Sequence, residues 1–340
     1  MQTHPIAARV KSIVRKSLYY SGAASVVRSI RRSRFAGCRV INFHRILRND
    51  VPPEYYARHM SEPTAAELEE LLVHLRRWFH FISPREFLDA VIGLRSLDPY
   101  SLILTFDDGH VDFYERLVPL LDRLGVPATV FINTAAMAGE TLWFQKLFAA
   151  VIHSPLEDFP GGLGVPALPL TTVAQRIRAI KEFAIIHQRL PPEQWDELVP
   201  RICDAFHWNG NLHDERMLTW EQLESMRKCP WITVGGHTVS HPFLPRCDDN
   251  RLQSELVQCA RELRQRLRLD FLPFSYPNGG SDPRVASAVE KAGYDCSFSI
   301  VPGLNTLRTP RHQLFRHYVA PNVIGASFDL SFRVPLGGPE

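Results

Sequence analysis

The stretch Leu102-Ile103-Leu104-Thr105-Phe106-Asp107-Asp108-Gly109 carries an apolar run directly into two carboxylates and a glycine. The apolar run predicts a buried strand, and Asp-Asp-Gly predicts the turn that ends it. Adjacent side chains of a strand point to opposite faces, but the chain bends at a strand end, so both carboxylates can reach one site. In α/β folds, the C-terminal ends of parallel strands carry the catalytic groups. A solvated turn is the competing interpretation, and this stretch alone favours neither.

Short apolar runs and amphipathic helical patterns alternate on both sides of this stretch. Further strands are predicted at residues 40–43, 128–133, 232–235, 271–276 and 296–300. The first predicted helix begins with Thr64 and Glu67 at the spacing of a capping box. The predicted helices cover residues 64–79, 84–92, 112–124, 248–267 and 282–292. This alternation predicts a parallel sheet covered by helices, either an α/β barrel or an open wound sheet.

Residues 140–215 interrupt the alternation. A loop rich in proline and glycine is followed by two helical stretches, at 173–187 and 192–206. We interpret this segment as a helical insertion on the body of the protein rather than a second domain. The predicted organisation is an N-terminal arm at residues 1–39 and one folded domain at residues 40–340.

The charge of the chain is unevenly distributed. Residues 1–49 hold eleven of the 39 basic side chains and no acidic one, so the rest of the chain carries 28 basic and 36 acidic groups. An acidic body excludes nucleic-acid binding over the whole surface, because such binding needs a basic footprint. Apolar residues of the arm recur three or four apart between the basic ones, which predicts basic amphipathic helices. These helices either pack on the body or bind anionic lipid through residues 1–35.

Neither a membrane span nor a secretory signal is visible in the sequence. No apolar run approaches about 18 residues, and Arg and Lys recur through the N-terminal region. The six cysteines are scattered without a Cys-x-x-Cys pair, so no thiolate zinc site is indicated, and a reducing compartment is favoured. We therefore expect a cytoplasmic protein, with peripheral contact at the inner membrane surface as an option.

A second polar cluster, Gly236-His237-Thr238-Val239-Ser240-His241-Pro242, follows the strand predicted at 232–235. Two histidines four residues apart can bind one metal ion if the segment is helical or turned. With 14 histidines in 340 residues, about half an occurrence of this spacing is expected by chance. Together with an Asp from another strand end, the pair becomes a two-His, one-carboxylate set with open positions, which is typical of catalytic zinc or iron.

The stretches 105–109 and 237–242 together resemble the motifs of the polysaccharide deacetylase family, the NodB-homology carbohydrate esterases of family 4. The resemblance extends to one branch of that family and covers about residues 40–320 in order. Each piece is short, but their ordered combination is specific. The further motifs are Ile41-Asn42-Phe43-His44-Arg45, Leu142-Trp143-Phe144, Met217-Leu218-Thr219-Trp220 and Phe274-Ser275-Tyr276-Pro277-Asn278-Gly279.

The resemblance implies a deformed, incomplete (β/α) barrel of seven strands, similar to a TIM barrel, as the catalytic domain. It implies hydrolysis of N-acetyl groups on a polysaccharide, an oligosaccharide or a glycolipid precursor. By the same resemblance, Asp108, His237 and His241 would hold a divalent metal, for which we favour Zn²⁺. Asp107 would be the general base, and the metal would polarise the acetamide carbonyl and activate a water molecule.

The third motif of the family supplies contacts to the substrate and the oxyanion. Tyr276 and Asn278 are expected in these roles, Asn278 through its backbone N–H. Many members have Arg-x-Pro-Tyr here, with the Arg orienting the catalytic Asp, whereas this chain has Ser275-Tyr276-Pro277-Asn278. Arg316, near the last strand, is the candidate substitute for the missing arginine.

An acid must protonate the departing amine, because an amide anion is a poor leaving group. Relatives with a permuted order take this acid from the N-terminal strand, which favours His44, and His317 is the alternative. A hydrogen-bonded core histidine is the competing interpretation of either. Two other functions stay open, namely hydrolysis of a non-sugar C–N bond and sugar binding without catalysis. The presence of both Asp107 and Asp108 argues against the second, since a binding site needs no base. The oligomeric state stays open.

Overall fold

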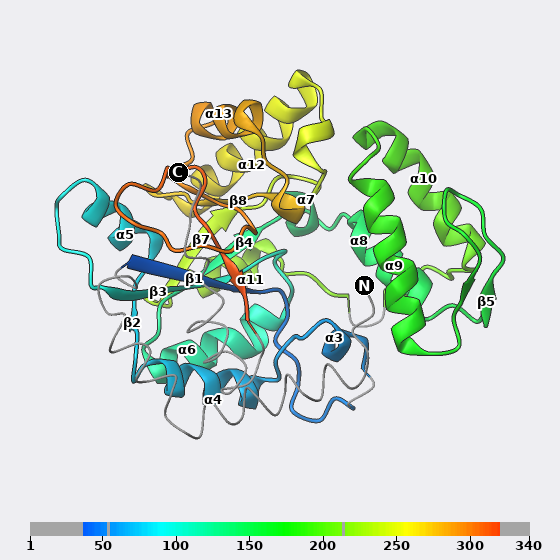
Figure 1. Ribbon diagram of the computed structural model, residues 1–340, viewed down its shortest axis with the longest axis horizontal. Helices are drawn as coiled ribbons and strands as arrows, with labels where there is room; N and C mark the ends of the chain where they lie inside the picture. Colours follow the sequence, from blue (N-terminus) through cyan, green and yellow to red (C-terminus); the bar gives the residue numbers. More distant parts are fainter. Residues whose placement is uncertain (1–36, 53–54, 213–214, 320–340) are drawn as a thin grey trace.

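A parallel sheet forms the centre of the protein (Figure 1). The computed structural model describes residues 37–52, 55–212 and 215–319. Within them, the strand order is β10-β1-β3-β4-β7-β8-β9, and β2 pairs with the start of β3. All of these pairings are parallel. The strands are β1 (Gly37–Phe43), β2 (His80–Phe81), β3 (Tyr100–Phe106), β4 (Ala128–Ile132), β7 (Ile232–Gly236), β8 (Phe274–Ser275), β9 (Ser297–Phe298) and β10 (His317–Tyr318).

The sheet curves into an incomplete barrel whose strands shorten towards one side. β1 and β3 have seven residues each, whereas β8, β9 and β10 have two each. The chain around β10 links the two ends of the sheet, because Leu314 bridges to Phe298 in β9 and His317 pairs with Ile41 in β1. This is the deformed, incomplete barrel that the family resemblance implies, rather than an open wound sheet, although the described sheet has eight strands instead of seven.

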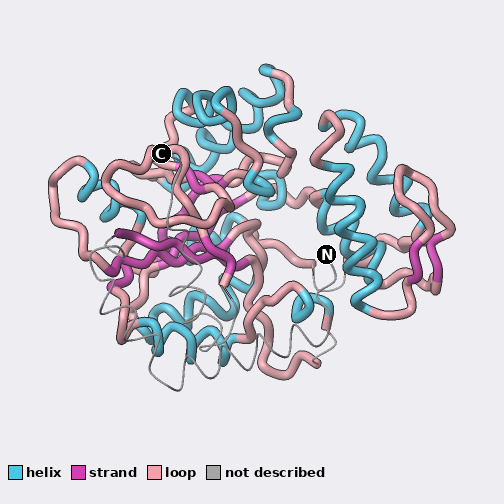
Figure 2. Tube along the Cα trace, in the orientation of Figure 1, coloured by secondary structure: helices cyan, strands magenta, loops and turns pink. Residues whose placement is uncertain are grey.

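Helices surround the sheet and pack their apolar faces onto it (Figure 2). In α4, Leu68, Leu71 and Leu72 lie on one face and are fully buried, and the predicted capping box between Thr64 and Glu67 forms. The helices around the barrel are α4 (Ala65–Leu75), α5 (Pro84–Val91), α6 (Val118–Leu124), α7 (Thr134–Met137), α11 (Trp220–Met226), α12 (Asp249–Leu267) and α13 (Pro283–Lys291), with the 3₁₀ turns η3 (Leu244–Arg246) and η4 (Pro277–Gly279). The short helix α3 (Tyr56–His59) packs instead against the helix at Val173–His187.

The segment between β4 and β7 builds a separate helical layer, which appears in green to one side of the sheet in Figure 1. Its helices enclose their own apolar cluster. Both helical stretches predicted within residues 140–215 are present, as α9 and α10. β4 and β7 nevertheless pair directly, so the segment leaves the strand order undisturbed. Its elements are α8 (Trp143–Ile152), α9 (Val173–His187) and α10 (Pro192–Ala205), with the hairpin of β5 (Asp158–Phe159) and β6 (Leu168–Pro169).

Three predicted elements differ from the structure in length or type by more than a terminal turn. The strand predicted at 271–276 covers only Phe274–Ser275, because Pro273 has no N–H to donate to a strand ladder. The strand predicted at 296–300 is likewise reduced to β9. The helix predicted at 112–124 starts as a π-helix, η2 (Phe113–Leu117), before it continues as α6.

The N-terminal arm lies almost wholly outside the described residues. Residues 37–39, which we assigned to the arm, belong to β1, because the strand pairs with β3 from Gly37 onward. Residues 1–36, with their predicted amphipathic helices and membrane contact, are not described. No helix in the described part of the chain combines the length and the hydropathy that crossing a bilayer requires.

Strand β7 packs so closely against its neighbours that Gly235 has no room for a side chain. A Cβ atom at Gly235 would lie 2.5 Å from Cδ1 of Phe131 and 2.7 Å from the carbonyl oxygen of Pro273. We expect Gly235→Ala to lower the free energy of unfolding, measured in urea, by about 1–3 kcal/mol. The control is Thr233→Ala on the same strand, which should cost less than about 1 kcal/mol. Equal stability of the two variants would contradict this close approach.

Candidate active site

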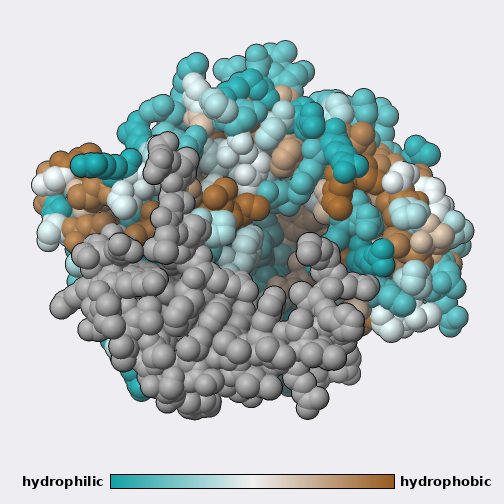
Figure 3. Space-filling view, in the orientation of Figure 1, coloured by the Kyte–Doolittle hydropathy of each residue, from teal (hydrophilic) through white to brown (hydrophobic). Residues whose placement is uncertain are grey.

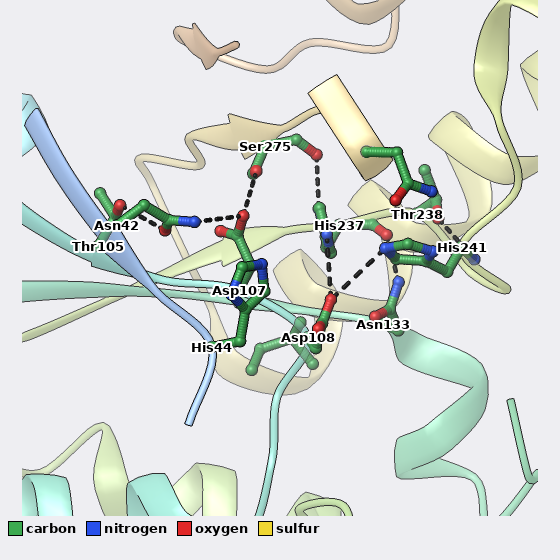
Figure 4. A network of polar contacts seen from close by, with 12 residues as sticks. Asn42, His44, Thr105, Asp107, Asp108, Asn133, His237, Thr238, His241 and Ser275 are labelled. Carbon is green, nitrogen blue, oxygen red and sulfur yellow. Dashed lines mark hydrogen bonds and ion pairs between the residues drawn. The ribbon is translucent and has the colours of Figure 1, made fainter. Parts of the chain in front are cut away.

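The C-terminal end of β3 presents two carboxylates to one site. Asp108 and Gly109 have φ angles of +78° and +84°, so the chain turns sharply after Asp107. This left-handed region is uncommon for residues other than glycine, although Asp tolerates it better than most. As a result, the Asp107 carboxylate points towards Ser275 and the Asp108 carboxylate towards His237 (Figure 4). The bend that the sequence predicts therefore brings the carboxylates of Asp107 and Asp108 to one site, where each has different neighbours.

Asp107 is held by a buried arginine. Arg316 Nη1 donates to Oδ1 of Asp107 at 2.8 Å, and Nη2 donates to Oδ2 at 2.8 Å. Asn42 Nδ2 and Ser275 Oγ each donate to the same Oδ2 at 3.2 Å. Burial alone would raise the pKa of Asp107, but the Arg316 charge, the nearby His237 and the Arg316 hydrogen bonds together outweigh it and hold this pKa below its ordinary value. Asp107 is therefore an ionised carboxylate at neutral pH.

Arg316 reaches this position from the chain just before β10. Its Nε donates to the carbonyl oxygen of Ser299 at 2.8 Å, and its Nη2 also donates to Ser275 Oγ at 2.8 Å. Ser275 stands where the resemblance leads one to expect an arginine, and its short side chain makes room for this guanidinium. Arg316, the predicted substitute arginine, therefore contacts the carboxylate that it is expected to orient.

Asp108 faces two histidines. Its Oδ1 is 3.4 Å from Nε2 of His237 and 3.5 Å from Nε2 of His241. The three ligand atoms all lie within 4.8 Å of one another. His237 Nδ1 is 2.7 Å from the carbonyl oxygen of Ser275, which can only accept, so Nδ1 carries a proton and the ring directs Nε2 towards Asp108. The predicted metal ligands are brought together.

A strained turn, rather than a helix, brings the two histidines together. Thr238 and His241 have φ angles of +70° and +63°, and a β-branched residue in this region is a genuine outlier. Thr238 Oγ1 accepts from the His241 N–H at 2.9 Å, and Glu255 of α12 accepts from two further N–H groups of the turn at 2.9 Å each. Trp143 Nε1 donates to the carbonyl oxygen of His241 at 2.8 Å. Contacts from two helices therefore hold the strained turn.

The protonation states in this cluster suit metal binding. Burial would raise the pKa of Asp108, but the hydrogen bond with His237 and the nearby imidazoles hold it well below its ordinary value. Burial lowers the pKa of His241 to about 4. At neutral pH, Asp108 is consequently a carboxylate and His241 a neutral imidazole, and metal ligands need these forms.

His44 follows β1 directly and stands beside the two carboxylates. Its Nδ1 is 3.2 Å from Oε1 of Glu62, its Nε2 is 3.3 Å from the Tyr318 hydroxyl, and its ring stacks on that tyrosine. Burial lowers the pKa of His44, but Tyr318 and Glu62 raise it by more, so it lies well above its ordinary value. The protonated form is thus favoured.

The other predicted site residues are placed differently. The Tyr276 hydroxyl donates to the carbonyl oxygen of His312 at 2.8 Å, and the Tyr276 N–H donates to Phe298. Both polar groups are used inside the core, but Tyr276 still lines the cavity, so a contact with substrate would involve its ring rather than its hydroxyl. His317 turns away from the cavity, with Nε2 2.7 Å from the carbonyl oxygen of Gly303. This position disfavours it as the acid.

Asn278 lines the cavity with a φ angle of +51°, next to the short strand β8. Its side-chain nitrogen is 3.5 Å from Nδ1 of His187 in α9. The third motif therefore contacts the helical layer as well as the barrel.

A cavity of about 230 Å³ joins these groups. It is lined by Asp107, Asp108, His44, His237 and His241, with Asn278 among the other lining residues. No local pattern in the sequence marks Glu62, Tyr318 or Glu255 as site residues. Asn42 could have been found from the sequence, because it lies near the end of β1, two positions before His44, and side chains two positions apart point the same way.

Solved structures share the fold of this chain at low sequence identity. The deacetylase PplD of Streptococcus pyogenes, solved in complex with acetate, is 16% identical with a TM-score of 0.57, over 84% of this chain and 93% of that one. IcaB of Ammonifex degensii is 18% identical with a TM-score of 0.53, over 86% and 97%. The deacetylase domain of BpsB from Bordetella bronchiseptica is 18% identical with a TM-score of 0.54, over 83% and 96%.

Sequence comparison identifies the family. YxkH of Bacillus subtilis (strain 168), which carries the family's name, is 20% identical over 265 residues, covering 76% of this chain and 67% of that protein. The family model described as polysaccharide deacetylase matches residues 95–182 and 194–297, more than half of the chain. The matched region contains Asp107, Asp108, His237 and His241. The chain belongs to the polysaccharide deacetylase family of hydrolytic enzymes.

Proposed function

We propose that this family member removes N-acetyl groups from a carbohydrate by attack of water, with a divalent metal ion at Asp108, His237 and His241. One observation carries the proposal. Asp107, a buried carboxylate fixed by Arg316, is followed directly by a carboxylate that faces two histidines, and both carboxylates line one cavity. Two neighbouring carboxylates in such different surroundings are suited to different tasks.

The residues present fit a small divalent ion such as zinc. Two ligand atoms bound at about 2.0–2.1 Å to a tetrahedral ion lie about 3.3 Å apart. The separations of Asp108 Oδ1 from the two imidazole nitrogens, 3.4 and 3.5 Å, agree with this spacing. His237 is also oriented through its second nitrogen by a backbone carbonyl, as metal-ligating histidines usually are.

Asp107 and Asn278 would act on the acetyl group. When bound, the ion would polarise the acetyl carbonyl and lower the pKa of a water molecule. Asp107, ionised and oriented by Arg316, would accept the proton that the water loses as its oxygen bonds to the carbonyl carbon. The backbone N–H of Asn278 would donate to the carbonyl oxygen as that oxygen gains charge.

His44 would supply the proton that the leaving amine needs. As the C–N bond breaks, the sugar nitrogen takes this proton and the acetyl carbon leaves as acetate with the oxygen from water. His44 suits this role better than His317 because it lines the cavity and because Glu62 favours its protonated form.

Substitutions at Asp107 and at His241 should distinguish the general base from a metal ligand. We expect Asp107→Asn to lower kcat for acetate release by about 10²–10⁴-fold, because the base is lost, while metal content stays at the level of the unchanged protein. His241→Ala should lose both metal and turnover. Activity and metal would be measured on the same preparations. Full activity of Asp107→Asn would exclude it as the base.

The pH profile should report on His44. A group that acts as an acid is active only while protonated, so the rate should fall as pH rises through the pKa of His44. Glu62→Gln removes a charge that raises this pKa, and the alkaline limb of kcat/KM should therefore move to lower pH. The acidic limb should stay in place.

The matched control for this experiment is Glu69→Gln, which changes an exposed carboxylate outside the cavity. It should leave both limbs unchanged. An unmoved alkaline limb in Glu62→Gln would remove His44 from the acid role.

The geometry of Arg316 should matter beyond its charge. Arg316→Lys keeps a cation but cannot make two parallel hydrogen bonds to Asp107. We expect kcat to fall by about 10–100-fold with little change in KM, since the base is misplaced rather than the substrate. Arg284→Lys, in an exposed ion pair with Asp249, is the control. Equal activity of the two variants would show that orientation by Arg316 is not needed.

A further inference from the structure

One wall of the catalytic cavity is apolar and comes from the helical layer. The catalytic residues all lie on the barrel side, at the ends of β1, β3 and β7. Figure 3 shows a hollow between the barrel and this layer, with hydrophobic residues on the side of the layer. The lining residues from the layer are mostly apolar, with Lys181 of α9 as the charged exception, and include Phe144, Leu147 and Phe148 of α8, and Ile180 and Ala184 of α9.

The apolar surface continues from the cavity to its rim. Met60 and Ile300 line the cavity and are 41% and 37% exposed. Large apolar side chains gathered at the mouth of a cavity mark a surface that binds an apolar partner.

The size of the cavity limits what can enter it. Its volume of about 230 Å³ is below the roughly 300–1,000 Å³ of typical small-molecule pockets. It can take about one sugar ring, and the rest of the substrate must leave across the rim. A second sugar at Met60 and Ile300 would lose water from its hydroxyl groups without gaining partners, which is unfavourable. A hydrocarbon chain there would instead gain burial.

We propose that the substrate is an acetylated sugar joined to a hydrocarbon chain, and that this chain lies on Met60, Ile300 and the apolar wall of α8 and α9. The inference rests on the proposed deacetylase function, because it places the acetylated sugar at the catalytic residues. It adds that recognition depends on an apolar tail rather than on a longer run of sugars.

The test uses methyl, butyl and octyl glycosides of N-acetylglucosamine below their micelle concentrations, with the metal-loaded full-length protein. Each fully buried methylene improves binding by up to about fourfold. We therefore expect the octyl glycoside to bind at least about tenfold more tightly than the methyl glycoside in calorimetry. Among the glycosides that are turned over, kcat/KM should rise in the same order. A matched series of one, two and four sugar units should show no comparable gain.

Variants at the rim of the cavity test whether the octyl chain binds at Met60 and Ile300. Met60→Gln and Ile300→Asn should each reduce the octyl-to-methyl affinity ratio by at least about threefold, because each adds a polar group under the tail. Val257→Asn changes a side chain of matched exposure, 42%, on α12 outside this cavity, and should leave the ratio unchanged. Thermal unfolding would confirm that all three variants are folded.

The two hypotheses fail separately. Three results would overturn the proposal of a hydrocarbon tail. They are equal affinity for the methyl and octyl glycosides, a higher affinity for the octyl glycoside that the Met60 and Ile300 variants retain, and an affinity that rises with the number of sugar units. Absence of acetate release from every acetylated saccharide, with tight binding of the octyl glycoside, would overturn the deacetylase function but not the apolar subsite.

Discussion

The buried ion pair between Arg316 and Asp107 is the contact on which the rest of the site depends. It joins the start of β10 to the end of β3, across β1, which lies between them in the sheet. Removing one partner of such a pair leaves an uncompensated charge and typically costs about 3–5 kcal/mol. Arg316 and Asp107 therefore stabilise the fold only as a pair. Their contact fixes the position at which the short strand β10 closes the barrel. The same contact fixes the orientation of the Asp107 carboxylate.

This contact also explains how two adjacent carboxylates come to differ. Asp107 accepts hydrogen bonds from the guanidinium, Asn42 and Ser275, whereas Asp108 faces the imidazoles of His237 and His241. The left-handed backbone at Asp108 separates the two groups. Their different surroundings allow one to act on protons and the other to bind a cation, without any difference in their intrinsic chemistry.

The helical layer between β4 and β7 contributes more than an apolar wall. Trp143 of α8 donates a hydrogen bond to the carbonyl of His241, and the ring of His187 of α9 packs on Trp143 at a tilt, with ring centres 4.2 Å apart. His187 also contacts Asn278 of the third motif. The layer thus supports both the histidine turn and the third motif, although its residues lie outside the sheet. A substitution in its core would consequently disturb the metal cluster as well as the cavity.

Local patterns in the sequence were sufficient for the elements and for the main chemical groups. Apolar runs and caps predicted the helices and strands, and the positions of Asp107, Asp108, His237 and His241 at strand ends placed them at one site. Family motifs also pointed to Arg316. Tertiary structure alone decided that Glu62 stands beside His44, that the Tyr276 hydroxyl turns into the core and that His317 faces away. The reason is physical: strand alternation and helix periodicity act between neighbours in the chain, whereas contacts such as Arg316 to Asp107, 209 residues apart, form only when the barrel closes.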